Sequence, residues 1–133
     1  MAHANARRRH LVVGGRAGRE TRLKIVVCVK SVPDTTSERS FTPEFAVDRR
    51  ASTSRLSELD EYAVEQALQL AEVDSSVTIT YLTMGPQEAI DAVRKALSMG
   101  GDEGAHVVDA ALAQSDYLAT SRVLAAAIQR LGF

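Results

Sequence analysis

The first sustained apolar run of the chain is IVVCV, residues 25–29. An unbroken run rich in β-branched residues is typical of a strand buried on both faces of a parallel sheet. A second run, VTITYLTM, occupies residues 77–84, and a shorter one follows at residues 105–108. Apolar side chains at helical spacing mark residues 57–72 and 87–99, and a last helix is expected after Ser115 or Asp116. Alternating strands and helices predict an α/β fold with a three-layer, right-handed parallel sheet.

The predicted helices have recognisable starts and ends. Glu58, Asp60 and Glu61 lie in the first turn of the first helix, where carboxylates complement the positive end of the helix dipole. The buried face of that helix is expected to consist of Leu59, Ala63, Ala67, Leu70 and Ala71. In the second helix, Ile90, Val93 and Leu97 are expected to be buried, and Gly100-Gly101 ends the helix.

Residues 33–55 lack such periodicity. They are polar, contain Pro43, and include only one short extended piece at residues 45–47. We therefore expect a long loop, of a length that in compact domains is usually functional or wraps a neighbour.

Composition and charge narrow the function classes. The chain has 133 residues, 45% of them apolar and 5% aromatic, which suits one domain with an aliphatic core. Six of the sixteen Lys and Arg but only one of the seventeen Asp and Glu lie in residues 1–23, so this segment carries +5 and the remainder −6. We expect residues 1–23 to be a disordered extension and residues 24–133 to form the domain. A mildly acidic body excludes a nucleic-acid partner.

The single cysteine, Cys28, excludes an internal disulfide and fits a reducing, cytoplasmic location. Because Cys28 lies inside the first apolar run, we expect a buried strand thiol. No stretch approaches the roughly 18–20 apolar residues of a membrane helix, so a soluble protein without a membrane span is expected.

Motifs for catalysis and metal binding are absent. The sequence contains no Walker loop, no GxGxxG after the first strand, no CxxC and no HExxH. His3, His10 and His106 are too dispersed to indicate a metal site. These absences disfavour hydrolysis and adenylation.

Four segments occur in a fixed order: LKIVVCVKSVPDT at residues 23–35, LDEYAVEQAL at 59–68, MGP at 84–86 and RKALSMGGD at 94–102. This order resembles the β subunit of electron-transfer flavoproteins, whose pattern is V-K-x-V-P-D, D-E-x-A-V-E-x-A-L, S-M-G-P and R-K-A-L-A-M-G-A-D. The resemblance extends over nearly all of residues 23–133. It implies a Rossmann-like, adenine-nucleotide-binding fold of which this chain is the amino-terminal part, incomplete at the carboxyl end.

The resemblance also implies a function. In this family an αβ heterodimer takes electrons from acyl-CoA and related dehydrogenases and passes them to a quinone reductase. FAD is held mainly by the α subunit, and the β subunit typically holds a structural AMP, or a second FAD in electron-bifurcating relatives. The chain is then an electron carrier subunit with no catalytic residue of its own.

Carried over by position, the AMP contacts fall at the carboxyl ends of strands, as is general for open α/β sheets. They are Cys28, Ser57, Glu58, Leu59, Asp60 and Met84. The chain departs from the family where many relatives have Asn-Pro in place of Ser57-Glu58 and a small residue in place of Met84. The family's phosphate loop and its dehydrogenase-recognition loop belong to the second half and have no counterpart here.

Two other interpretations remain open. The chain could be a free-standing adenine-nucleotide-binding module resembling stress-response proteins, or an inert truncated product. A glycine-rich phosphate loop after the last strand would support the first alternative, and the sequence given ends before such a loop could occur.

Overall fold

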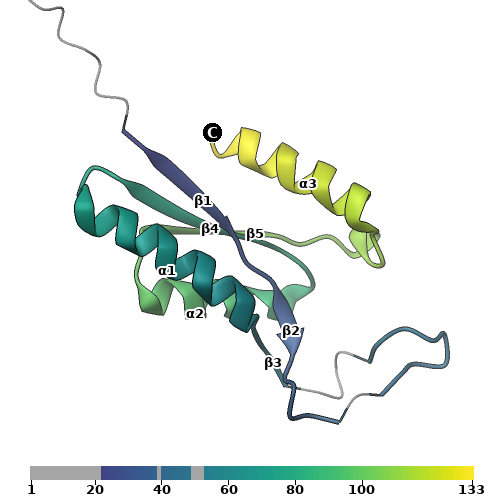
Figure 1. Ribbon diagram of the computed structural model, residues 1–133. Coiled ribbons are helices and arrows are strands. Elements are labelled where there is room, and N and C mark those ends of the chain that lie inside the picture. The colour runs from purple at the N-terminus through teal and green to yellow at the C-terminus, as the bar shows by residue number, and fades with distance from the viewer. Residues whose placement is uncertain (1–21, 39, 49–52) are drawn as a thin grey trace, which may run out of the picture.

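The computed structural model describes residues 22–38, 40–48 and 53–133, and strands and helices alternate along this part of the chain (Figure 1). The elements are β1 (Lys24–Cys28), β2 (Ser31–Pro33), β3 (Ser54–Leu56), α1 (Glu58–Val73), β4 (Thr78–Met84), the 3₁₀ turn η1 (Gln87–Ala89), α2 (Ile90–Met99), β5 (Glu103–Val107), the 3₁₀ turn η2 (Ala110–Leu112) and α3 (Tyr117–Arg130). The expectation for residues 1–23 falls, except for residues 22 and 23, outside the described residues.

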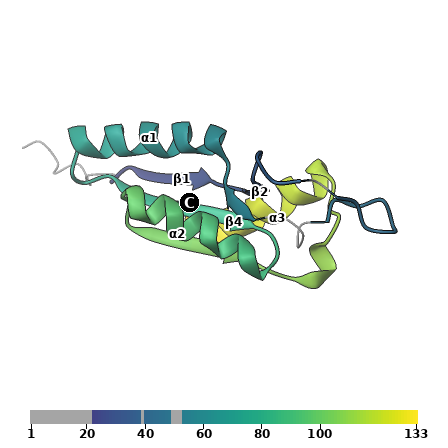
Figure 2. The same ribbon diagram turned by 90° about the horizontal axis from the view of Figure 1, so that it is seen from below.

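The main sheet is parallel, with the order β1-β4-β5. Cys28 at the end of β1 pairs with Leu82, and Met84 at the end of β4 pairs with Val107. Helices α1 and α2 cover one face, and α3 lies across the strands on the other (Figures 1 and 2). The predicted α/β class and its three layers are confirmed.

The core lies between this sheet and the helices α1 and α2. Ile79 and Tyr81 of β4 are fully buried there against Val64 of α1 and Val93 of α2. Packing of α2 on β5 is so close that a Cβ added at Gly104 would overlap Val93. Burial of these aliphatic groups, worth roughly 25 cal/mol per Å² of apolar surface, drives the association of the layers.

The expected buried face of α1 is partly wrong. Ala67 is buried as predicted, but Leu59 is 75% exposed and Leu70 is 53% exposed. The helix is rotated so that Val64, Ala67 and Leu68 face the sheet. Alanine is small enough to be accommodated in either rotation of helix α1. Val64 is larger than alanine, and in the observed rotation it fills the space between α1 and β4.

The second face of the sheet is less well covered. Helix α3 contains no buried residue. Its amino end is nevertheless capped, because the Asp116 carboxylate accepts a hydrogen bond from Ala119 N at 2.8 Å. The expectation that β1 is buried on both faces is therefore wrong, and so is the expectation of a buried thiol: Cys28 is exposed. Its strand lies at an edge of the sheet, where the second face is open.

The described parts of the segment after β1, residues 31–38, 40–48 and 53–56, contain more secondary structure than the expected long loop. Strands β2 and β3 pair in an antiparallel manner, with Val32 opposite Arg55. Beyond them, residues 40–48 form a small hairpin, here called the aromatic hairpin, in which Phe41 pairs with Val47. It projects from the body of the molecule (Figure 1).

Within the described residues, no helix combines the length and the apolar character needed to cross a membrane.

Candidate functional site

The carboxyl ends of β1 and β4 and the amino end of α1 meet at one side of the molecule. Parallel strands end there together, which is where open α/β sheets bind ligands. Two clefts lie in this region.

The first, here called the strand-end cleft, has a volume of about 250 Å³. Its walls include Cys28, Lys30, Asp60, Met84, Thr120 and Leu124. It therefore brings together three of the six residues expected from the sequence, Cys28, Asp60 and Met84. Buried Leu82 forms the apolar floor between β1 and α3.

The second, here called the helix-start cleft, has a volume of about 170 Å³. It is lined by the other three expected residues, Ser57, Glu58 and Leu59, together with Val32, Pro33 and Arg55. The six expected residues thus occupy one region but two clefts.

Asp60 connects the segment after β1 to the first turn of α1. One carboxylate oxygen accepts the backbone N–H of Lys30 at 2.8 Å, and the other accepts Lys30 Nζ at 3.0 Å. Ser57 N donates in turn to Lys30 O at 3.1 Å. These bonds fix the segment after β1 against the start of α1, and each carboxylate oxygen of Asp60 accepts one of them.

The start of α1 offers hydrogen-bond donors. The first N–H groups of an α-helix have no partner within the helix, and in the described structure the N-cap residue, Ser57, makes no side-chain capping bond. Ser57 is only 5% exposed. The N–H groups of Glu58 and Leu59 are consequently available to acceptor atoms of a ligand.

The electrostatics of this region do not favour a phosphate. Glu58, Asp60 and Glu61 all lie in the first turn of α1. Arg55 is shared between two carboxylates, since its Nη2 lies 3.0 Å from Glu58 Oε1 and its Nη1 lies 3.8 Å from Asp34 Oδ2. Hydroxyl groups of a ribose and the polar edge of a base, which donate hydrogen bonds, suit this setting better than an anion.

Cys28 is a poor nucleophile in this cleft. Partial desolvation raises the pKa of its thiol above the ordinary value, and the nearby Asp60 carboxylate raises it further. Because the thiolate is the reactive form, the thiol of Cys28 is less reactive at neutral pH than that of a free cysteine.

Asp34 organises the segment after β2. Its carboxylate accepts hydrogen bonds from Thr36 N at 2.9 Å and Thr36 Oγ1 at 2.8 Å. These bonds, the backbone one first, lower the pKa of Asp34, and Arg55 contributes in the same direction. Asp34 is thus charged at neutral pH, and its hydrogen bonds to Thr36 stabilise the turn that follows β2.

The two clefts differ in the chemistry of their walls. Leu82, Met84 and Leu124 give the strand-end cleft apolar walls for a flat ring, and the helix start gives polar donors. Each cleft is smaller than the roughly 300–1,000 Å³ of typical ligand pockets. The described residues include no group of three His, Cys, Asp or Glu placed to hold a metal ion.

His106 has a structural contact. Its Nε2 lies 3.1 Å from Gly85 O, which can only accept, so this nitrogen carries the proton. The bond supports the turn between β4 and η1.

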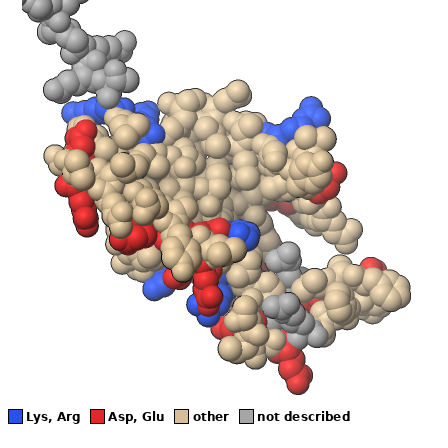
Figure 3. All heavy atoms as spheres, viewed as in Figure 1, with Lys and Arg blue, Asp and Glu red and all other residues tan. Residues whose placement is uncertain are grey.

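Sequence reasoning missed Lys30, Thr120 and Leu124 as cleft residues. The sequence signal for Leu124 is its helical spacing with Ala127, Ile128 and Leu131, which predicts that these residues share one apolar face of the last helix. The contact depends on the placement of α3 over β1 and β4, which no local pattern encodes. On the face shown in Figure 3, acidic and basic side chains are interspersed, without a continuous basic surface.

Comparison with known proteins identifies relatives. The family profile of the electron transfer flavoprotein domain matches residues 45–133. The electron transfer flavoprotein subunit beta of Mycobacterium tuberculosis is 45% identical, with 78% of this chain and 41% of that protein aligned. The subunit of the same name from Megasphaera elsdenii is 40% identical, over 82% of this chain and 40% of that protein.

A further relative is the acryloyl-CoA reductase electron transfer subunit gamma of Anaerotignum propionicum, which is 36% identical over 83% of this chain and 41% of that protein. The chain spans about two fifths of the length of these curated relatives.

Proposed function

The chain belongs to the electron transfer flavoprotein domain family, and on that premise we propose that it acts as a β-type subunit of an electron-carrying flavoprotein. In this proposal it pairs with an α subunit, and the heterodimer carries electrons from acyl-CoA and related dehydrogenases to a quinone reductase. The observation that carries the proposal is the family match over residues 45–133, supported by relatives named as electron transfer subunits.

We propose that the chain contributes to a structural AMP site. Cys28, Met84 and Leu124 would contact the adenine ring, and the N–H groups of Glu58 and Leu59 would bond polar atoms of the base or ribose. The apolar walls of the strand-end cleft and the uncapped start of α1 support this assignment. The acidic first turn of α1 argues that the phosphate is bound by other residues.

The chain itself is proposed to be a carrier subunit and not an enzyme. The redox group would be FAD, held mainly by the α subunit, and it supplies the uptake and release of electrons when bound. This chain's residues would hold the AMP and the subunit contact. The raised pKa of the exposed Cys28 thiol supports a role as a contact residue and not as a nucleophile. A single cysteine suits a cytoplasmic location.

The proposal can be tested by co-expressing the chain with the α subunit encoded in the same genome. We expect a complex that contains FAD, and AMP in the nucleotide extract of the purified complex. Met84→Trp fills the strand-end cleft and should reduce the AMP content, whereas Val73→Trp, at an 89% exposed position at the end of α1, should not.

Failure to form a complex with the α subunit would contradict the proposed function. Tight binding of AMP by the isolated chain, without any α subunit, would instead favour the free-standing nucleotide-binding module. Measurement of AMP binding by titration calorimetry distinguishes the two.

A further inference from the structure

The aromatic hairpin, residues 40–48, has its own internal order. Thr42 N donates to Ala46 O at 2.8 Å, Phe45 N donates to Thr42 O at 2.9 Å, and Asp48 N donates to Ser40 O at 2.9 Å. Phe41 and Val47 are paired across the hairpin, so their side chains lie next to each other. The hairpin is therefore a preformed structure.

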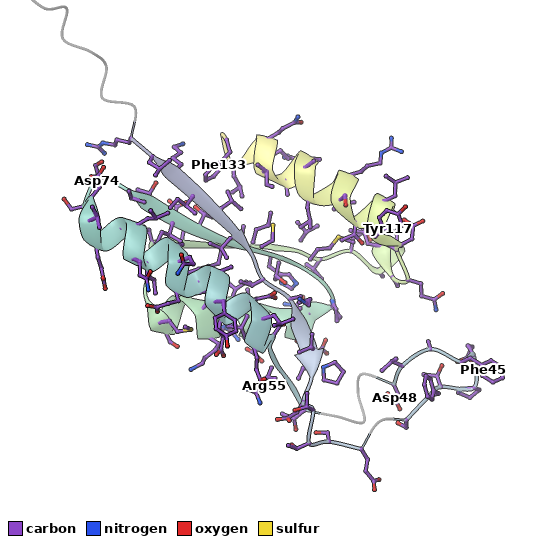
Figure 4. The ribbon with its side chains drawn as sticks, viewed as in Figure 1. Phe45, Asp48, Arg55, Asp74, Tyr117 and Phe133 are labelled. Carbon is purple, nitrogen blue, oxygen red and sulfur yellow. The ribbon has the colours of Figure 1, made fainter. Side chains whose placement is uncertain are left out.

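Its large apolar side chains are in solvent. Phe45 is 90% exposed, Phe41 is 69% exposed and Val47 is 44% exposed. Figure 4 shows Phe45 at the tip of the hairpin, far from the sheet, with Asp48 nearer the body. The projection of the hairpin keeps the described part of the chain from covering these rings.

The backbone at the tip is strained. Phe45 has φ of 61°, in the left-handed region, which is an outlier for a bulky side chain. Such outliers cluster at binding sites, where the strain presents a side chain in a fixed direction. Here the strained residue is also the most exposed ring of the described chain.

The available area argues against a second copy of the chain as the occupant. A phenylalanine buries about 150–250 Å² when fully covered, so the two exposed rings can bury only roughly 300 Å². If the rings were the whole contact, two hairpins packed against each other would bury roughly 600 Å², which is well below the about 1,200 Å² of a stable specific interface. A pocket in a different protein can enclose the same rings while the surrounding surface supplies the remaining area.

We propose that the aromatic hairpin is a docking element that inserts Phe45 into an apolar pocket of the partner subunit, with Phe41 and Val47 packed at the mouth of that pocket. This inference rests on the proposed function, in which the chain acts in a heterodimer. Aromatic residues enclosed in such pockets commonly dominate binding energy. Glu44, next to Phe45 in the turn, places a carboxylate at the rim, which a Lys or Arg of the partner would complement.

The test uses the double variant Phe41→Thr/Phe45→Asn. Thr is suited to a strand position, and Asn tolerates the left-handed conformation, so the hairpin keeps its shape while both rings are lost. The matched control is Tyr117→Asn, which removes a ring that is 86% exposed at the start of α3. Binding of the full chain to the purified α subunit is measured by biolayer interferometry, and circular dichroism with urea unfolding verifies that both variants are folded.

We expect the double variant to bind the α subunit at least tenfold more weakly and the control to bind within twofold of the unsubstituted chain. Unchanged binding of the double variant would overturn the docking element and leave the proposed function standing. Equal loss in the Tyr117 control would also overturn it, because the effect would then not be specific to the hairpin. If the unsubstituted chain does not bind the α subunit, the proposed function itself fails, and this inference fails with it.

Sedimentation of the chain alone tests whether the aromatic hairpin binds a second copy of the chain instead of the partner subunit. The double variant should have the same distribution of oligomers as the unsubstituted chain. Conversion of an oligomer to a monomer by the double variant would show that the hairpin binds a second copy.

Discussion

The carboxylate of Asp60 accepts hydrogen bonds from both the backbone N–H and the Nζ of Lys30. The segment after β1 is thereby tied to the first turn of α1, and both residues line the strand-end cleft. Asp60 was expected from the sequence as a ligand contact, but the structure gives it internal partners. At this scale the residue identities are predictable, whereas the partners are not, because they depend on how β1 and α1 are brought together.

Cys28 and Asp60 are coupled electrostatically, and this leads to a measurable prediction. Desolvation in the cleft raises the pKa of the Cys28 thiol, and the negative charge of Asp60 adds to the increase. Because the thiolate is the reactive form, alkylation by iodoacetamide should accelerate only at a higher pH than for a free cysteine. Asp60→Asn should move the alkylation profile toward lower pH without restoring the value of a free thiol, since the desolvation remains.

The control for this prediction is Glu65→Gln, which removes a carboxylate on the exposed side of α1. An alkylation profile that is the same in the Asp60 variant and in the unsubstituted chain would show that Asp60 does not act on the thiol.

Among the elements, those with a strong periodic pattern were predictable. The runs at residues 25–29, 77–84 and 105–108 became β1, β4 and β5, each within two residues of the expected bounds. Strands β2 and β3 were missed because each has three residues and is stabilised by pairing with the other, which a local pattern does not reveal. The same applies to the aromatic hairpin, whose polar and aperiodic sequence gives no sign of its backbone hydrogen bonds.

The N-cap of α3 gives a prediction at the element scale. Asp116 accepts a hydrogen bond from Ala119 N, and loss of an N-cap costs about 0.5–2 kcal/mol. Asp116→Ala should therefore lower the free energy of unfolding by about 1 kcal/mol, measured by urea denaturation. Asp116→Asn retains an acceptor and should be close to neutral. An equal loss in both variants would indicate that the charge, and not the cap, stabilises the helix.

On the scale of the whole molecule, the family resemblance implies a doubly wound sheet in which the first three strands lie side by side in the order 3-2-1, and the observed order β1-β4-β5 agrees with it. The region of the candidate site was also predictable, because ligands bind at the carboxyl ends of parallel strands. The division of the site into two clefts was not predictable, because the helix-start cleft depends on the pairing of β2 with β3. The contribution of α3 was not predictable either, because it depends on how α3 packs on the second face of the sheet. That face is covered only by α3 in the described structure, which contributes no buried residue.

The open edge of β1 predicts self-association of the isolated chain. In the part of the chain that the structure describes, β1 pairs only with β4, and its run IVVC contains no proline or bulge. Unpaired edges of this kind are templates for association. Sedimentation at tens of micromolar should show dimers or larger species, and addition of the partner subunit should reduce them. A stable monomer at this concentration would contradict the role assigned to the edge.

The most direct test of the account is transfer of electrons that depends on this chain. The α subunit, FAD and a substrate-reduced acyl-CoA dehydrogenase are mixed with and without the chain, and the visible absorbance of the flavin is followed. The account predicts rapid bleaching of the flavin only when the chain is present, because the chain supplies the β-type half of the carrier. Bleaching at the same rate in the absence of the chain would contradict it.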